Sequence, residues 1–387
     1  MKLNYLLLLI SFTISHFTFS QSINNLINQV SEQGIVQMVR DLSGEDSTLV
    51  SGNNVLIEHR VSSIGNNLSA DYINERLISY GLNVSTINYS STGRNIVATQ
   101  IGTINPNNIY IISAHYDAVA NYGADDNASG ATAILESARI LSNYKFENTI
   151  IYALWDEEEE GLIGATDYAI NAAFNDENIL AVLNIDMIGY DGDGDRLFDI
   201  NVRNEAASFQ IKNDLINIVS SYNLDLLSNV VDPGTSNSDH AAFWMVGYSS
   251  ALLGEAWSTN DVTPGYHSDS DRINLFDISY FHNMVKLCVG YISTKGVLIN
   301  SLGLNSFDLL HSTIYPNPTS GKINIEFGGL IKGELTVLSI NGEIVIQQKI
   351  QGKQVEIKNF ENLASGIYIF RIIDNKGNTS NLKVVKE

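Results

Sequence analysis

The stretch HYDAVANYGADDNASG, from His115 to Gly130, joins a predicted strand to a predicted helix. The apolar run IYIISA directly before it, residues 109–114, is typical of a buried strand. ATAILESARIL directly after it, residues 131–141, has the apolar spacing of a helix. His115 therefore lies at the carboxyl end of a strand, and Asp126 lies in the loop that enters the helix. Because ligands bind at this edge of open α/β sheets, we expect a functional site here.

Three further segments place carboxylates or His in comparable positions. IIYALWDEEEEGLIG, residues 150–164, reads as a strand followed by a turn and a helix. A third apolar strand, ILAVLNIDMIGY at 179–190, carries Asp186, and GYHSDSD at 265–271 carries His267. His and carboxylate side chains are ligands that suit zinc. The sequence thus predicts a zinc site made by residues far apart in the chain.

Strand and helix patterns alternate through the greater part of the chain, which predicts a mostly parallel or mixed sheet with helices on both faces. Such patterns lie at 109–114, 129–143, 149–155, 161–172 and 179–186. We expect this α/β domain to cover residues 21–305. Beyond it, LTVLSINGEIVIQQ predicts a hairpin with Asn341 and Gly342 in its turn. Residues 311–387 are expected to form a small all-β sandwich.

The amino terminus has the pattern of an export signal. Lys2 precedes the apolar run LNYLLLLISFTI, and small residues follow near Ser20, so residues 1–20 are predicted to be a cleaved signal peptide. A membrane anchor is the alternative, but the run is short for a span, and no other stretch is long enough. We expect an exported protein without a stable membrane span. Cys288, the only Cys, is expected to be a buried apolar residue.

The charge balance argues against two classes of polyanionic partner. The formal net charge is −21. Residues 311–387 carry nine Lys or Arg and seven Asp or Glu, a balance of +2, so the rest of the chain carries −23. Such an acidic body repels nucleic acid and anionic membrane surfaces.

Zinc chemistry suggests how the site residues divide their roles. Two cations about 3.5–4 Å apart need a shared anionic ligand, and Asp126 lies in a loop of small residues that can approach both. Each zinc ion then needs one His and one further carboxylate. The pairs that supply them are His115 with Asp186, and His267 with Glu159. Two more residues have expected roles outside the ligand set: Asp117 accepts the His115 N–H, and Glu158 moves the proton of the attacking water.

Together these segments resemble the M28 family of zinc peptidases, which are di-zinc aminopeptidases. Five segments within about residues 60–295 carry the resemblance: His115-Tyr-Asp117, GADDNASG at 123–130, EEEGLIGA at 158–165, NIDMIGY at 184–190, and YHSDSD at 266–271. The family implies the same ligands as above, Glu158 as general base, Asp117 beside the ligand shell, and a cis peptide bond after Asp126. Within DEEEE, the pair Glu157 and Glu158 stays open as an alternative to Glu158 and Glu159.

The resemblance implies a secreted zinc aminopeptidase that acts on peptides. Two alternatives stay open: a glutaminyl cyclase-like acyltransferase on the same fold, which works with one zinc, and an exported, non-catalytic adhesin. The family's Tyr that assists the oxyanion has no evident counterpart, and Thr235 lies near its position. His240, in SDHAAFW, is expected to be a structural residue near the cleft. Met187 follows a predicted ligand directly, and we expect the aromatic residues Phe243 and Trp257 to line the cleft. These residues predict a preference for large apolar N-terminal residues.

Two other segments allow separate predictions. Asp191, Asp193 and Asp195 in DGDGD have the spacing of a calcium loop, although an acidic surface turn is the alternative. Residues 311–387, with YPNPTSG at 315–321, LASGIYIFRI at 363–372 and a Lys-rich end, resemble the sorting domain of type IX secretion substrates. That resemblance implies export by the type IX machinery to the medium or the cell surface. A carbohydrate-binding sandwich is the alternative.

Overall fold

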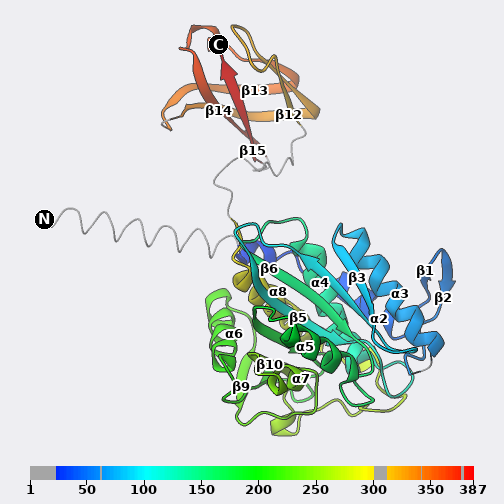
Figure 1. Ribbon diagram of the computed structural model, residues 1–387. Helices are drawn as coiled ribbons and strands as arrows, with labels where there is room; N and C mark the ends of the chain where they lie inside the picture. Colours follow the sequence, from blue (N-terminus) through cyan, green and yellow to red (C-terminus); the bar gives the residue numbers. More distant parts are fainter. Residues whose placement is uncertain (1–22, 62, 300–311, 341, 376–378) are drawn as a thin grey trace, which may run out of the picture. The chain divides into compact units, whose positions relative to one another are not determined.

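The computed structural model describes residues 23–299 and 312–387, except residues 62, 341 and 376–378. The predicted signal peptide and the predicted boundary between the domains lie outside these ranges. The chain divides into two compact units, one ending at Ile299 and the other beginning at Asn300 (Figure 1). In the described residues, no helix is both long and apolar enough to cross a bilayer.

The first unit is built on an eight-stranded mixed sheet in the order β3-β4-β6-β5-β7-β10-β8-β9. Its strands are β3 (Asn83–Asn88), β4 (Arg94–Gln100), β5 (Asn105–His115), β6 (Asn148–Trp155), β7 (Ile179–Ile185), β8 (Leu197–Asn201), β9 (Leu227–Val231) and β10 (Ser250–Glu255). The four central strands β6, β5, β7 and β10 are parallel, while β4 and β8 flank them in the antiparallel sense. A small hairpin of β1 (Thr48–Val50) and β2 (Asn53–Val55) lies apart from this sheet.

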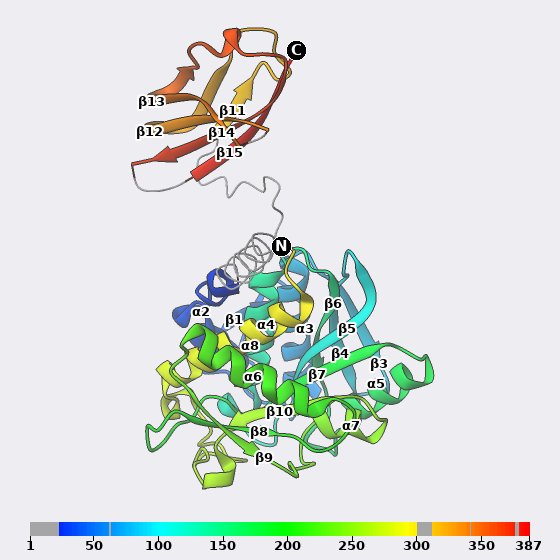
Figure 2. The same cartoon turned by 90° about the vertical axis from the view of Figure 1, so that its left-hand side faces the viewer.

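Helices cover both faces of the sheet, as predicted (Figures 1 and 2). The larger core contains residues of α2 (Glu32–Leu42), α3 (Ser63–Ser79), α4 (Gly130–Leu141), α6 (Ser208–Tyr222) and α8 (Ile278–Gly296). The smaller core contains residues of α5 (Ile163–Phe174) and α7 (His240–Met245). Strand β6 shows why: Tyr152 and Leu154 enter the larger core, whereas Ala153 and Trp155 enter the smaller one. This alternation buries the strand on both faces. Cys288 is buried in α8, as expected.

Strands β8 and β9 were not expected from the sequence. Each has only five residues, and β8 reads LFDIN, so its apolar residues alternate with Asp199 and Asn201. Such a short segment, with two of its five side chains polar, does not stand out from a loop. Its two polar residues prove to line the cleft described below.

The second unit is all-β, as predicted. Its strands β11 (Ser312–Tyr315), β12 (Asn324–Ser339), β13 (Ile344–Glu356), β14 (Gly366–Asp374) and β15 (Thr379–Lys386) form one antiparallel sheet. The long strand β12 pairs with β11 near its start and with β14 over its second half, and its register against β13 shifts between Glu326 and Ile331. The single sheet therefore folds around a core of its own, which includes Leu335 and Phe370. Strands β12 and β13 form the predicted hairpin, and Gly342 has a φ of +84° in its turn.

Candidate active site

Six of the predicted site residues meet at one edge of the sheet. His115 ends β5, Glu158 and Glu159 follow β6, and Asp186 follows β7. These strands are parallel neighbours, so their carboxyl ends coincide. Asp126 and His267 come from the loops before α4 and α8. All six line a cleft of about 840 Å³.

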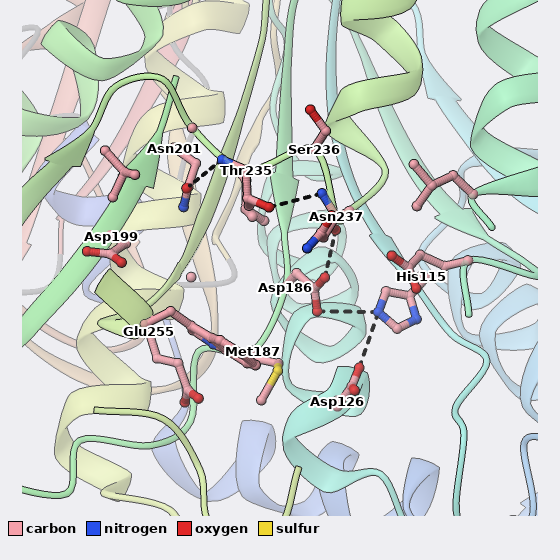
Figure 3. Close-up of a pocket in the computed structure, with 18 of the residues that line it drawn as sticks. His115, Asp126, Asp186, Met187, Asp199, Asn201, Thr235, Ser236, Asn237 and Glu255 are labelled. Carbon is pink, nitrogen blue, oxygen red and sulfur yellow. Dashed lines mark hydrogen bonds and ion pairs between the residues drawn. The ribbon is translucent and has the colours of Figure 1, made fainter. Parts of the chain in front are cut away.

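Asp126 lies between the two His residues. The Nε2 atom of His115 is 3.4 Å from Oδ1 of Asp126, and Nε2 of His267 is 3.2 Å from its Oδ2. Each His also faces a second carboxylate: Oδ1 of Asp186 is 3.3 Å from His115 Nε2, and Oε2 of Glu159 is 3.3 Å from His267 Nε2. Figure 3 shows the contacts of His115. One oxygen of Asp126 therefore faces His115, which Asp186 also contacts, and the other oxygen faces His267, which Glu159 also contacts.

Asp117 contacts the other nitrogen of the His115 ring. Its Oδ1 is 3.3 Å from Nδ1 of His115, on the side of the ring away from the cleft residues. Its two oxygens also accept hydrogen bonds from the backbone N–H groups of Glu158 and Glu159, at 3.2 Å and 3.1 Å. One carboxylate therefore orients the His115 ring and the start of the acidic turn together.

The carboxylates of this cluster outnumber its two His side chains, so its negative charge is not balanced from within. Burial raises the pKa of Glu158 to about 10 and that of Glu159 to about 8. Burial lowers the pKa of His115, but nearby carboxylates, first Asp186 and then Glu158, outweigh it and raise that pKa well above its usual value. Oε1 of Glu159 is buried and has no hydrogen-bond partner among the described residues. A crowded set of imidazole and carboxylate ligands with an unpartnered oxygen fits divalent cations such as zinc.

Within DEEEE, the two middle glutamates reach the cleft. Glu158 and Glu159 line it, whereas Glu157 accepts a hydrogen bond of 2.9 Å from the Thr92 hydroxyl. The alternative pair of Glu157 and Glu158 therefore lacks one of its members at the site.

The loop that carries Asp126 is held by residues from distant segments. The Asp126–Asn127 peptide bond is cis, as the family resemblance implies. The carboxylate of Asp271 accepts the backbone N–H groups of Asp125 and Asp126, both at 2.9 Å. The Asn127 side chain donates to the carbonyl oxygen of Ile185 at the end of β7. These bonds tie the loop to the strand that precedes Asp186.

Arg60 also stabilises the loop that carries Asp126. It is 1% exposed, and its guanidinium donates to four backbone carbonyl oxygens at 2.6–2.8 Å. These oxygens belong to Leu42, Tyr116, Tyr122 and Gly123. Arg60 thereby links α2 to both ends of the segment that runs from His115 to Asp126.

Ser238 is a further residue that the sequence did not reveal. Its hydroxyl donates to Oδ2 of Asp186 at 2.6 Å and accepts from the Asn184 amide at 2.8 Å. The oxygen of Asn184 in turn accepts from Ser113. This buried chain fixes the Asp186 carboxylate. In the motif SDHAAFW, the first residue, Ser238, contacts the predicted ligand Asp186, whereas His240 does not.

His240 is structural, as expected. It is buried, and its Nε2 lies 2.9 Å from the carbonyl oxygen of Thr235. Burial lowers its pKa to about 4. Its ring packs edge-on against Trp244. Thr235 itself lines the cleft, as does Tyr266, whose ring stacks on His267.

The prediction that Phe243 lines the cleft is wrong. Met187 and Trp257 do line it. Phe243 is buried in the smaller core, where its ring contacts Trp155 and Tyr168. Helix α7 turns this face toward the sheet, so a residue near the cleft in sequence points away from it.

In the DGDGD turn, carboxyl oxygens of Asp191, Asp193 and Asp195 lie within 4.8 Å of one another. Asp191 also forms an ion pair with Arg196 at 2.9 Å, and all three side chains accept backbone N–H groups of the turn. These contacts favour the acidic turn, and the calcium site stays a prediction.

Comparison with known proteins agrees with the geometry. Residues 95–292 match Peptidase family M28, and residues 313–387 match the secretion system C-terminal sorting domain. Leucine aminopeptidase 1 of Trichophyton equinum is 29% identical over 231 residues, covering 55% of this chain and 61% of that protein. Leucine aminopeptidase 1 of Trichophyton rubrum is 28% identical over 237 residues, with the same coverage. The chain thus spans less than two thirds of the length of these relatives.

Solved structures share the fold of the first unit. The LapA aminopeptidase of Legionella pneumophila aligns with a TM-score of 0.61 and 20% identity over 71% of this chain and 75% of that one. The glutaminyl cyclase of Porphyromonas gingivalis aligns with a TM-score of 0.53 and 17% identity over 69% of this chain and 99% of that one. At this identity the similarity concerns the fold alone. The family match covers about half of the chain and includes the cleft residues from His115 to His267. It shows that the protein belongs to peptidase family M28.

Proposed function

We propose that this protein is an exported aminopeptidase that uses two zinc ions to hydrolyse the first peptide bond of peptides. The observation that carries the proposal is the position of Asp126, whose two oxygens face two different His residues, each with a second carboxylate. His115 and Asp186 would hold one ion, His267 and Glu159 the other, and Asp126 both. Bound zinc would acidify the attacking water and polarise the scissile carbonyl.

Glu158 is the proposed general base. It lines the cleft, and one of its oxygens lies within 4.8 Å of ligand atoms of His115 and Asp186. Because each proposed ion already has one His, one further carboxylate and Asp126, we assign Glu158 to the proton and not to a metal. Bound divalent cations would lower the pKa of Glu158 from its raised metal-free value. Its carboxylate would then take the proton of the attacking water, whose oxygen adds to the scissile carbonyl carbon. When the C–N bond breaks, Glu158 returns that proton to the leaving amine. The products are a free amino acid and a peptide shortened by one residue.

A one-zinc glutaminyl cyclase is the second candidate, because such a protein shares the fold. Reporter substrates separate the two. We expect the purified chain to release the reporter from aminoacyl p-nitroanilides with a free amine, and at least about 100-fold more slowly from their N-acetylated forms, because the free amine is part of the bound group. Cyclisation of glutaminyl peptides without hydrolysis would favour the cyclase, and inactivity toward both would favour the adhesin.

We further propose that the second unit directs the peptidase to the type IX secretion machinery, after export by residues 1–20. The sorting-domain match and the separate core of this unit support the proposal. A chain ending at Ile299 should keep its reporter hydrolysis, because the cleft lies wholly in the first unit. In a host with this machinery it should accumulate in the periplasm, whereas the full chain reaches the surface or the medium. A truncated chain that still leaves the cell would contradict the sorting role.

A further inference from the structure

The cleft extends away from the His and carboxylate cluster toward β8. Strand β10 lies between β7 and β8, and its register places Gly254 opposite Asp199 and Leu252 opposite Asn201. Residues opposite each other in an antiparallel pair share a face, and all four line the cleft. Since neighbouring strands are about 4.8 Å apart, Asp199 lies roughly 10 Å from β7, the strand that Asp186 follows. Figure 3 shows Asp199 and Asn201 across the cleft from His115 and Asp126.

Gly254 keeps the passage between these two ends open. A Cβ atom at this position would lie 2.8 Å from the carbonyl oxygen of Asp186, closer than real Cβ contacts allow. The glycine therefore leaves the middle of the cleft floor without a side chain. Met187 and Leu252 add apolar surface beside it. The passage suits the aliphatic stem of a long side chain.

Asp199 ends this passage with a negative charge. It accepts hydrogen bonds from the backbone N–H and hydroxyl of Ser258, both at 2.7 Å, and from the Asn229 amide at 2.8 Å. All three donors are neutral, and three of the roughly four acceptor positions of the carboxylate are used. Across the described residues, Asp199 pairs with no Lys or Arg, and the cleft lining contains neither. A buried carboxylate without a cation is costly, so a cationic ligand group would be favourable here.

Glu255 is the other lining carboxylate outside the zinc-ligand cluster. Its Oε1 accepts the backbone N–H of Thr263 at 2.8 Å, and its Oε2 lies buried near Asp125 without a hydrogen-bond partner among the described residues. Burial, and then the Asp125 carboxylate, raise the pKa of Glu255 well above its usual value, which favours the neutral form. Glu255 does not end the passage.

We propose that Asp199 determines the specificity of the cleft by binding the cationic side chain of an N-terminal Lys or Arg. This inference rests on the proposed aminopeptidase function and names its substrate class. The aliphatic stem lies along Met187 and Leu252 while the charged tip reaches Asp199, as long cationic side chains do on apolar surfaces. The earlier expectation of an apolar preference depended in part on Phe243, which lies outside the cleft. An apolar side chain would leave Asp199 buried without a cation, which disfavours its binding.

The first test uses the unmodified, zinc-loaded full chain. Lysyl and norleucyl p-nitroanilides share the same stem, and only lysine carries the charge. We expect kcat/KM to be about 10- to 100-fold higher for lysyl than for norleucyl, with arginyl close to lysyl, because hydrogen bonds to charged groups are strong. Calorimetry should show tighter binding of free lysine than of norleucine. Equal or better use of norleucyl overturns the inference.

The second test uses Asp199→Asn, which keeps the size and removes the charge. The ratio of lysyl to norleucyl kcat/KM should fall at least about tenfold. Asp225→Asn is the matched control, since the Asp225 carboxylate is 75% exposed and does not line the cleft; it should leave the ratio unchanged. If Asp199→Asn does not fold, the lysyl to norleucyl ratio of the unmodified chain decides alone. Hydrolysis of norleucyl without a lysyl preference refutes only this inference, whereas no hydrolysis of any reporter refutes the aminopeptidase as well.

Discussion

Replacing Glu158 with Gln should lower kcat by about 10²–10⁴-fold, which is the usual contribution of a positioned general base. The substitution keeps the shape of the side chain and removes its ability to take a proton. The zinc content should not change, because His115 with Asp186 and His267 with Glu159 remain intact on either side of Asp126. The KM should change much less than kcat, since Glu158 acts on the water. Steady-state kinetics beside elemental analysis measures both effects.

Glu159→Gln is the matched variant, one residue along the same turn. Glu159 faces His267 at 3.3 Å, so its loss should weaken one zinc site. Its activity should therefore recover in part when excess zinc is added, whereas that of Glu158→Gln should not. If Glu158→Gln loses zinc and Glu159→Gln keeps it, the two roles are exchanged. If neither change lowers turnover, the proposed mechanism fails.

Replacing Arg60 with Met should lower the free energy of unfolding by about 3–5 kcal/mol, the usual cost of removing one partner from a buried charged network. The methionine fills part of the volume but leaves four carbonyl oxygens without their donor. Buried acceptors without partners are costly. Because two of these oxygens, those of Tyr122 and Gly123, belong to the segment before Asp126, zinc affinity should fall as well. Urea denaturation of the zinc-loaded protein measures the change.

Arg40→Met provides the control for the loss of an arginine. Arg40 is about one third exposed and pairs with Asp46 at 2.7 Å on the surface. Exposed ion pairs contribute little to stability because solvent and salt screen them, so this variant should remain close to the unmodified protein. A loss below about 1 kcal/mol for Arg60→Met would show that the carbonyl oxygens find other donors, and that Arg60 does not hold the loop.

Much of the site followed from the sequence because most of its residues follow directly after strong strand patterns. The run IYIISA before His115 and the run ILAVLNI before Asp186 both form central parallel strands, β5 and β7. Parallel neighbours place their carboxyl ends together, so these residues meet without any further information. The helices α4 and α5 also followed from their helical patterns, and they cover the sheet as expected.

The supporting residues could not be inferred in the same way. Arg60 acts on carbonyl oxygens of Leu42 and Tyr116, and no local pattern marks an arginine that binds distant backbone. Ser238 donates to Asp186, which lies 52 residues away in the sequence. Asp199 lies in a five-residue strand whose pairing with β10 sets its direction. In each case the decisive fact is a tertiary contact.

A zinc titration of the metal-free protein, with hydrolysis of a free-amine reporter followed at each step, tests the proposed two-zinc site. Because Asp126 faces two separate His and carboxylate sets, we expect the protein to bind about two equivalents of zinc and to need the second for full activity. Binding that saturates at one equivalent, with full activity at that point, would refute the two-zinc site.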